Sequence, residues 1–211
     1  MAQLRGSPSE DARRFYDTLT TRRSIRDFDP QEIAAEVIER LLTAACSAPS
    51  AHNRQPWRFC VILDEPLKVR LAKSMGAALW IDRISDGVDQ EEIQAEVDRS
   101  YHRITGASVV IVICLTMEDM DRYPDEARSH AEHLMAVQSV AMAGENLLLM
   151  AHAEGLGACW MCAPLYSQDI ARDVLDLPSS WEPQGMIIVG QPSGEGRDRS
   201  RMSLDKVVIW R

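Results

Sequence analysis

Residues 134–162 read LMAVQSVAMAGENLLLMAHAEGLGACWMC, and this stretch decides the fold class. Its first part is apolar almost all round a helical projection, so we expect one long helix over residues 125–154 that is buried on most sides. The glycines at 155 and 157 are typical of a helix C-terminus, and residues 158–162 then predict a strand. One Gln, one Glu and one Asn interrupt the apolar run, which favours a core helix over a membrane span.

On both sides of this stretch the chain alternates extended and helical patterns. Apolar runs predict strands over residues 57–63, 108–115 and 184–189, with a last extended piece over 204–210. Apolar residues at helical spacing predict helices over residues 10–19, 31–45, 66–75, 89–104 and 167–175. The second of these helices would start at Asp29-Pro30, and Ser167 would cap the last.

This order of elements predicts an α+β protein with a single domain over residues 10–211, after a loose tail at residues 1–9. A central helix that is apolar all round needs more cover than a 211-residue monomer supplies, so we expect an oligomer.

Composition excludes several classes of protein. The chain has 45% hydrophobic and 26% charged residues, which is ordinary for a soluble globular protein. A net charge of -9 disfavours a general nucleic-acid-binding protein, so we expect no nucleic-acid partner and no membrane partner. The N-terminus lacks the apolar run of a secretory signal, and the cysteines number five. We therefore expect a cytoplasmic protein with reduced thiols.

Two arginine clusters are candidates for anion binding. Residues 20–26, TTRRSIR, place three arginines and three hydroxyls between two predicted helices, a combination suited to phosphate recognition. A solvated basic turn explains the same residues equally well. Arg197, Arg199 and Arg201 form a second cluster, which gains importance only if folding brings it beside the first.

The loop at residues 49–57, PSAHNRQPW, is dense in amide, hydroxyl and imidazole groups and is stiffened by a proline at each end. Such groups suit the edge of a flat polar ring. From residue types alone, an ordinary loop that caps a helix explains them better.

Cys159 and Cys162 have the spacing of a redox dithiol or of half a zinc site. A reactive dithiol needs its first cysteine at a helix N-terminus, whereas Cys159 follows a predicted helix C-terminus. In a strand, two residues three apart also point to opposite faces. The sequence therefore favours a strand edge over a dithiol pair.

His130 and His133 share a helical face, but no further metal ligands accompany them, and we expect no metal site. The chain also lacks a G-x-S-x-G nucleophile elbow and a G-x-G-x-x-G dinucleotide motif.

Four stretches together resemble the nitroreductase-like family of FMN-dependent oxidoreductases. They are TRRSIRDF from residue 21, APSAHNRQPWRF from residue 48, GENLLLMAHAEGLGACW from residue 144, and IIVGQPSGEGRDRSRMSLDKVVIW from residue 187. The resemblance implies an α+β sandwich with a mostly antiparallel sheet flanked by helices. It also implies an intertwined homodimer whose core is the long helix, with one FMN at each end of the dimer interface.

The resemblance further implies roles for matching residues. The phosphate and ribityl chain of FMN would be held by Arg22, Arg23, Ser24, Arg26 and Arg201. The loop would contribute Asn53 and Gln55 near the flavin, and Pro49, Ser50 and His52 of the partner subunit. Main-chain groups near the flavin ring would come from Cys159, Trp160 and Met161.

A narrower resemblance connects the chain to the C-terminal flavin domain of the bifunctional ligase that builds coenzyme F-420. It is carried by ALWIDRISDG from residue 78, YPDEARSHAEHLM from residue 123 and DIARDVLDLPSSWEPQGMIIVG from residue 169. This resemblance implies a dehydro precursor of that deazaflavin as one acceptor.

We therefore expect an FMN-dependent oxidoreductase that passes hydride from NADH or NADPH through flavin N5 to a nitroaromatic, quinone or enone-like acceptor. No catalytic acid or base side chain stands out. Residues 76–106, anchored by Trp80 and Tyr101, would form a lid over the substrate. Two alternatives stay open: a flavin- or deazaflavin-binding carrier or sensor without turnover, and a thiol–disulfide enzyme.

Overall fold

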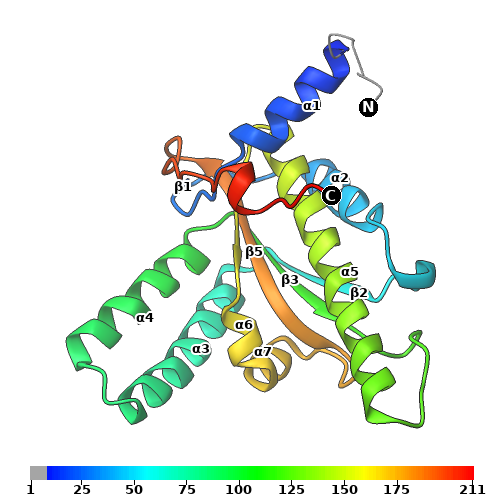
Figure 1. Ribbon diagram of the computed structural model, residues 1–211. Coiled ribbons are helices and arrows are strands. Elements are labelled where there is room, and N and C mark those ends of the chain that lie inside the picture. The colour runs from blue at the N-terminus through cyan, green and yellow to red at the C-terminus, as the bar shows by residue number, and fades with distance from the viewer. Residues whose placement is uncertain (1–8) are drawn as a thin grey trace.

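A five-stranded sheet runs through the centre of the computed structural model, which describes residues 9–211 (Figure 1). The strands are β1 (Phe28–Asp29), β2 (Trp57–Ile62), β3 (Val109–Leu115), β4 (Gly157–Met161) and β5 (Glu182–Pro192). Their order is β1-β5-β3-β2, β4 also pairs with β5, and all four pairings are antiparallel. The predicted α+β class with a mostly antiparallel sheet is confirmed.

Seven α-helices in the described residues surround this sheet. They are α1 (Glu10–Thr21), α2 (Ala35–Cys46), α3 (Glu65–Ser85), α4 (Gln90–Thr105), α5 (Glu126–Ala153), α6 (Ala163–Tyr166) and α7 (Gln168–Leu175). Short 3-10 turns lie at η1 (Ala51–Asn53) and η2 (Leu204–Lys206). In Figure 1 the α3–α4 pair lies on one side of the sheet, while α2 and α5 lie on the other.

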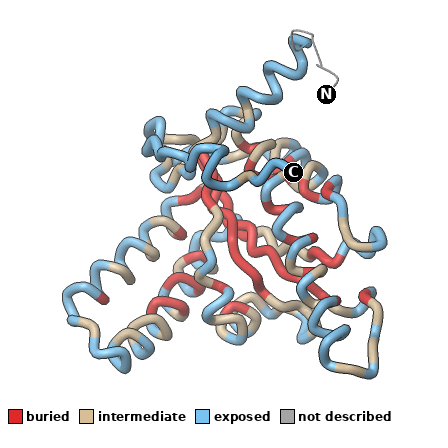
Figure 2. The backbone as a smooth tube through the Cα atoms, in the orientation of Figure 1, coloured by how far each residue is buried: buried red, intermediate tan, exposed pale blue. Residues whose placement is uncertain are grey.

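The central strand β3 explains why the molecule has two cores. All seven of its residues are buried, because helices cover both faces of the sheet (Figure 2). Val109, Ile111 and Ile113 point to the core shared with α2 and α5, whereas Val110 and Val112 point to the core shared with α3 and α7. The alternation of a strand thus divides one apolar run between two layers.

Helix α5 and strand β4 realise the helix–turn–strand pattern of residues 134–162. Asp125 caps the helix by accepting a hydrogen bond from the Arg128 main-chain N–H at 3.0 Å. At the other end Gly155 has φ +76°, and the Leu156 N–H donates to the Ala151 carbonyl at 2.8 Å. By length and composition α5 is long and apolar enough to cross a membrane, yet in the fold it covers the sheet.

The expected burial of α5 on most sides is met in one chain only on the faces toward the sheet and α2. Leu134 and Met142 remain 46% and 39% exposed on its outer side. Helix α1 is more exposed than α5, because none of its residues is buried, and Figure 1 shows it projecting away from the body.

Several predicted boundaries are wrong for identifiable reasons. Pro30 does not start α2, because the preceding pair of residues joins the sheet as β1 and the helix begins only at Ala35. Ser167 does occupy the predicted N-cap position of α7, but its side chain makes no capping hydrogen bond, because its hydroxyl donates to the Ala163 carbonyl at 3.1 Å in the unpredicted helix α6. The predicted helix at residues 66–75 is only the first half of α3, and residues 204–210 begin with a 3-10 turn rather than a strand.

The segment expected to be a lid, residues 76–106, is a helical hairpin made of the second half of α3 and α4. Its turn contains Gly87 at φ +77°, and Asp89 caps α4 by accepting from the Glu91 N–H at 2.9 Å. The predicted helix at residues 89–104 is confirmed, since α4 spans Gln90–Thr105. The tail predicted at residues 1–9 lies outside the described residues, except for Ser9, which caps α1.

Candidate functional site

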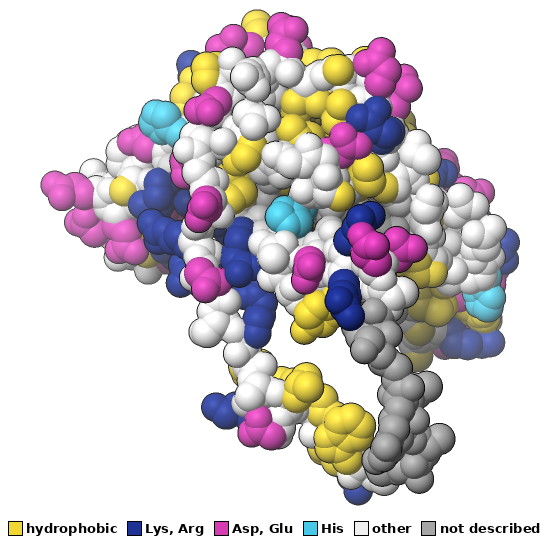
Figure 3. Space-filling model, turned by 90° about the horizontal axis from the view of Figure 1, so that it is seen from above, with side chains coloured by type: hydrophobic (Ala, Val, Ile, Leu, Met, Phe, Trp, Pro, Cys, Tyr) yellow, Lys and Arg dark blue, Asp and Glu magenta, His cyan; other side chains and the backbone are white. Residues whose placement is uncertain are grey.

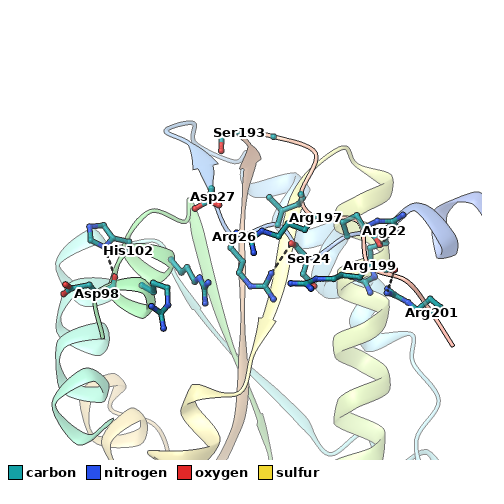
Figure 4. Close-up of a pocket in the computed structure, with 16 residues that line it drawn as sticks. Arg22, Ser24, Arg26, Asp27, Asp98, His102, Ser193, Arg197, Arg199 and Arg201 are labelled. Carbon is teal, nitrogen blue, oxygen red and sulfur yellow. Dashed lines mark hydrogen bonds between the residues drawn. The ribbon is translucent and has the colours of Figure 1, made fainter. Parts of the chain in front are cut away.

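An arginine-rich cavity of about 1090 Å³ opens at the end of the sheet where β1, β4 and β5 meet (Figure 4). Its lining comes from three separate parts of the chain: residues 22–27, residues 98–103 of α4, and the loop at residues 193–201. Eight arginines and two aspartates are among the lining residues. Figure 3 shows Lys and Arg side chains gathered on the face of the molecule seen from above. We refer to this cavity as the arginine cavity.

The segment that carries the first arginines is fixed to the sheet by its backbone. Ser24 forms a parallel bridge with Ala158 of β4, and the Ile25 N–H donates to the Ala158 carbonyl at 3.0 Å. Three residues after Ile25 the chain enters β1, where Phe28 lies opposite Pro192 of β5. The side chains of residues 22–26 are therefore presented from a segment that is bridged to β4 at Ser24 and continues into β1.

Glycines in the sheet make this attachment close. A Cβ atom on Gly157 would lie 2.7 Å from the Ile25 side chain, and one on Gly190 would lie 2.7 Å from the Phe28 ring. Both distances are well below the optimum separation of about 3.5–4.0 Å between carbon atoms. The absence of side chains at these two positions lets Ile25 and Phe28 anchor the segment against the sheet.

Arg22 gives the clearest indication that the cavity suits an anion. Its Nε atom is buried and has no hydrogen-bond partner among residues 9–211, and a carboxylate oxygen of Glu145 lies 3.7 Å away. Arg23 is better satisfied, since it contacts Asp198 at 2.9 Å and donates to the Thr20 carbonyl at 2.8 Å. A buried guanidinium donor without a partner is costly, and an anion in the cavity would satisfy it.

The cavity is also electrostatically positive. Burial, followed by the charges of Arg26 and Arg99, lowers the pKa of the Arg103 guanidinium. Burial, followed by the charges of Arg22 and Arg23, lowers the pKa of His152 behind the first cluster. In both cases burial is the larger cause and repulsion by neighbouring arginines the smaller one, and a bound anion would relieve that repulsion.

Folding joins the two arginine clusters of the sequence. Arg197, Arg199 and Arg201 line the same cavity as Arg22, Arg23, Ser24 and Arg26, so the condition that gave the second cluster importance is met. Figure 4 shows Arg22, Arg199 and Arg201 toward one end of the cavity.

All four lining residues on α4 were missed by the sequence analysis: Asp98, Arg99, His102 and Arg103. The available signal was the i, i+4 spacing of the two arginines, which places both on one face of a helix. That spacing alone does not reveal that the face turns toward the first cluster, because the α3–α4 hairpin decides it.

Strand β4 holds the second group of predicted residues. Cys159 is buried, while Trp160 and Met161 are half-buried. Trp160 is held between two glycines: a Cβ on Gly185 would lie 2.7 Å from its ring, and one on Gly144 would overlap the ring as well. The Trp160 indole N–H also points to the Cys162 sulfur at 3.2 Å.

The two cysteines of the C-x-x-C spacing occupy different environments. Cys159 is 2% exposed within β4, whereas Cys162 is exposed and lies at the start of α6, beyond the strand. All five cysteines are free. This placement gives no dithiol pair, and it also shows that the predicted strand ends one residue before Cys162.

The loop at residues 49–55 does not contribute to the arginine cavity of its own chain. It is tied instead to the middle of α5, where the Ala51 N–H donates to the Ser139 hydroxyl at 3.3 Å. His52, Asn53 and Gln55 have φ values of 49°, 55° and 50°, in the left-handed region that favours glycine. Strained backbone of this kind concentrates at functional sites.

The exposed side chains of this loop have no role within one chain that the structure explains. Pro49, His52, Asn53 and Gln55 are exposed, and Ser50 accepts a hydrogen bond from the Gln55 N–H at 3.0 Å. The Arg54–Asp121 pair at 2.5 Å anchors the loop from the other side.

No group of three or more His, Cys, Asp or Glu side chains with metal-binding geometry occurs in residues 9–211. His133 is engaged elsewhere, because its Nε2 atom lies 3.0 Å from a Glu182 carboxylate oxygen.

Comparison with known proteins agrees with this fold. The sequence pattern of the nitroreductase family matches residues 19–191. A protein of Archaeoglobus fulgidus, provisionally named an NADH dehydrogenase/NAD(P)H nitroreductase, is 30% identical over 179 residues, covering 83% of each chain. An NADH dehydrogenase of Thermus thermophilus is 28% identical over 214 residues, covering 90% of this chain and 92% of its own.

Among solved structures, a provisionally assigned nitroreductase of Desulfovibrio desulfuricans, determined in complex with FMN, superposes with a TM-score of 0.72. It is 24% identical, and the match covers 97% of this chain and 98% of the other. The sheet, the helical layers and the sequence pattern lead to the same conclusion: the chain belongs to the nitroreductase family.

Proposed function

We propose that the protein is an FMN-dependent oxidoreductase that takes hydride from NADH or NADPH and passes it to a nitroaromatic, quinone or enone-like acceptor. The observation that carries the proposal is the arginine cavity, in which a buried guanidinium nitrogen of Arg22 lacks a partner beside β4. The names of the relatives in Archaeoglobus and Thermus, and the FMN bound in the Desulfovibrio structure, support this choice.

The residues present fit the phosphate end of FMN. A phosphate monoester carries about two negative charges near neutral pH and accepts several hydrogen bonds. In the proposal these are met by Arg22, Arg23, Ser24, Arg26 and Arg201, which line one continuous cavity. When bound, the flavin supplies the hydride chemistry at N5, and the chain binds, orients and shields it.

The ring of the flavin is proposed to lie against β4, with main-chain groups of Cys159, Trp160 and Met161 at its edge. Trp160 cannot move toward α5, because Gly144 and Gly185 already fit closely around it. A strand edge held in this way keeps its N–H and C=O groups in fixed positions, which suits recognition of a flat heterocycle.

A homodimer is part of the proposal. Large apolar side chains are exposed on α1 and near the C-terminus, among them Phe15 at 62%, Tyr16 at 65%, Ile209 at 78% and Trp210 at 82%. Exposed apolar surface of this extent marks an interaction site. A second copy would cover it and would bring the strained loop, with Pro49, Ser50, His52, Asn53 and Gln55, toward a flavin at the interface.

The proposed acceptors include the dehydro precursor of coenzyme F-420, which the resemblance to the flavin domain of the F-420 ligase supports. The five free cysteines suit the reducing cytoplasm.

The first experiment measures flavin binding and turnover separately. The purified protein should be yellow and release FMN on denaturation. Under argon, NADH or NADPH should bleach the flavin, and a quinone or nitroaromatic should restore its absorbance. A protein that binds FMN but is neither reduced nor reoxidised would instead be a carrier or sensor, and one that takes up no FMN would refute the proposal.

The phosphate site is tested by Arg22→Met. Loss of a hydrogen bond to a charged group costs about 1.5–3 kcal/mol, so the Kd for FMN should rise roughly 10- to 150-fold. Arg70→Met is the matched control, because Arg70 is exposed on α3 outside the cavity. Equal FMN affinity in both variants, measured by flavin fluorescence on titrating apoprotein, would contradict the assignment.

A further inference from the structure

The arginines of α4 exceed what the phosphate of one flavin requires. A phosphate monoester offsets about two positive charges, whereas eight arginines and two aspartates line the arginine cavity. One of the aspartates, Asp98, already accepts a hydrogen bond from Gln94 at 2.8 Å. The remaining positive charge calls for a second anion.

The surplus positive charge lies away from the arginines that are proposed to hold the FMN phosphate. Figure 4 shows Asp98 and His102 of α4 at the opposite end of the cavity from Arg22 and Arg201, with Arg26 between the two ends. Arg99 and Arg103 belong to the α4 end, and their i, i+4 spacing puts them on one face of that helix.

These arginines are also free to bind. Among residues 9–211, neither Arg99 nor Arg103 has a carboxylate oxygen within 4.0 Å, and Arg26 has none either. Arg83, the other arginine of the hairpin at residues 76–106, does have such a partner in Glu96 at 3.1 Å. Arg103 is half-buried although no carboxylate pairs with it, and it lines the cavity beside Arg99, so the α4 end of the cavity is a preformed positive site. Burial first, and then the charge of Arg26, lowers the pKa of its guanidinium.

We propose that Arg99 and Arg103, together with Arg26, form a second anion site that selects a substrate bearing a carboxylate or phosphate group of its own. The inference rests on the proposed flavin enzyme and adds its substrate class. The acid group could belong to the acceptor or to the donor, since NADPH carries a phosphate that NADH lacks. Arginine forks recognise carboxylate and phosphate through the same paired N–H geometry.

The test compares matched ligands that differ only in the acid group. Benzoate and benzamide are titrated into the oxidised, FMN-loaded protein, and binding is read from the flavin absorbance without turnover. 4-Nitrobenzoate and 4-nitrobenzamide are then compared as acceptors, and NADPH and NADH as donors. The protein is the wild type, Arg99→Gln, Arg99→Gln/Arg103→Gln, or the net-charge control Arg70→Gln.

In the double variant, the preference for the acidic ligand over its neutral partner should fall roughly tenfold or more in at least one pair. Arg99→Gln should show an intermediate preference, and Arg70→Gln the same preference as wild type. A loss confined to the acceptor or benzoate pairs assigns the anion to the acceptor, and a loss confined to the donor pair assigns it to NADPH. The Kd for FMN should stay within about threefold of wild type.

Two results would overturn the inference while leaving the proposed function intact. One is an unchanged preference in all three pairs. The other is a Kd for FMN that weakens as much as the preference does, because the arginines of α4 would then serve the flavin phosphate. Failure of the wild type to bind FMN at all is a different result, which refutes the proposed function itself.

Discussion

Substitution of Gly144 by alanine tests how the structure holds strand β4. Gly144 lies in the buried part of α5, and its missing side chain leaves room for the indole of Trp160. A Cβ at this position would lie 2.9 Å from Cε3 of Trp160 and closer still to Cζ3. The ring has no free direction in which to move, since a Cβ on Gly185 would also lie 2.7 Å from it.

Two opposing effects determine the expected change in the free energy of unfolding. In an exposed helix, glycine to alanine stabilises by about 1 kcal/mol. Inserting a methyl group into close-packed surroundings costs about 1–3 kcal/mol, and the overlap here is severe enough to expect the upper part of that range. Gly144→Ala should therefore lower the free energy of unfolding by roughly 1–2 kcal/mol. In a Trp160→Ala background the overlap is gone, and the same substitution should raise the free energy of unfolding by about 1 kcal/mol.

The assay is urea unfolding followed by circular dichroism, for the four proteins of this cycle at one protein concentration. Gly76→Ala in α3 is the matched control, because its Cβ would meet only one methyl of Val97 at 3.0 Å, and its net effect should be near zero. Stabilisation of the wild type by Gly144→Ala, or an effect of the same sign and size in both backgrounds, would refute the reasoning.

Four further outcomes are expected. Gly190→Ala pushes β1 away from the sheet edge and should raise the Kd for FMN roughly fivefold or more in a fluorescence titration; an unchanged Kd would show that β1 does not position the arginines. Cys159→Ser combined with Cys162→Ser should leave flavin reduction largely intact, and its abolition with FMN still bound would restore the thiol mechanism. Trp80→Ala should change KM for acceptors but not FMN affinity, and unchanged turnover of every acceptor would remove the lid hypothesis. Because burial and nearby arginines lower the pKa of His152 in the folded state, stability should decline as the pH falls below about 6.5, and His152→Gln should flatten that part of the profile; identical profiles would contradict this.

The sequence by itself determined the elements that depend on local pattern. The long helix, its glycine stop and the following strand are all where residues 134–162 predict them, since apolar periodicity and a positive φ at Gly155 are local properties. The buried strand at residues 108–115 was equally readable from its unbroken apolar run.

Local pattern failed where neighbours in space compete for the same residues. Pro30 reads as a helix start, but the two residues before it pair with β5, which delays α2 to Ala35. Ser167 reads as a cap, but its hydroxyl is taken by the carbonyl of Ala163. A strand distant in the chain decided the first case, and the short helix α6 just before Ser167 decided the second.

The candidate site shows the same division. Residue types and order predicted the arginines of residues 22–26 and, through family resemblance, Arg201. Only the tertiary structure placed Arg197 and Arg199 beside them, turned Arg99 and Arg103 of α4 into the same cavity, and kept the loop at residues 49–55 apart from it. Charge clusters can be recognised along the chain, but a binding site forms where segments distant in sequence converge. Here β5 determines that convergence, because β1, β3 and β4 all pair with it along its length.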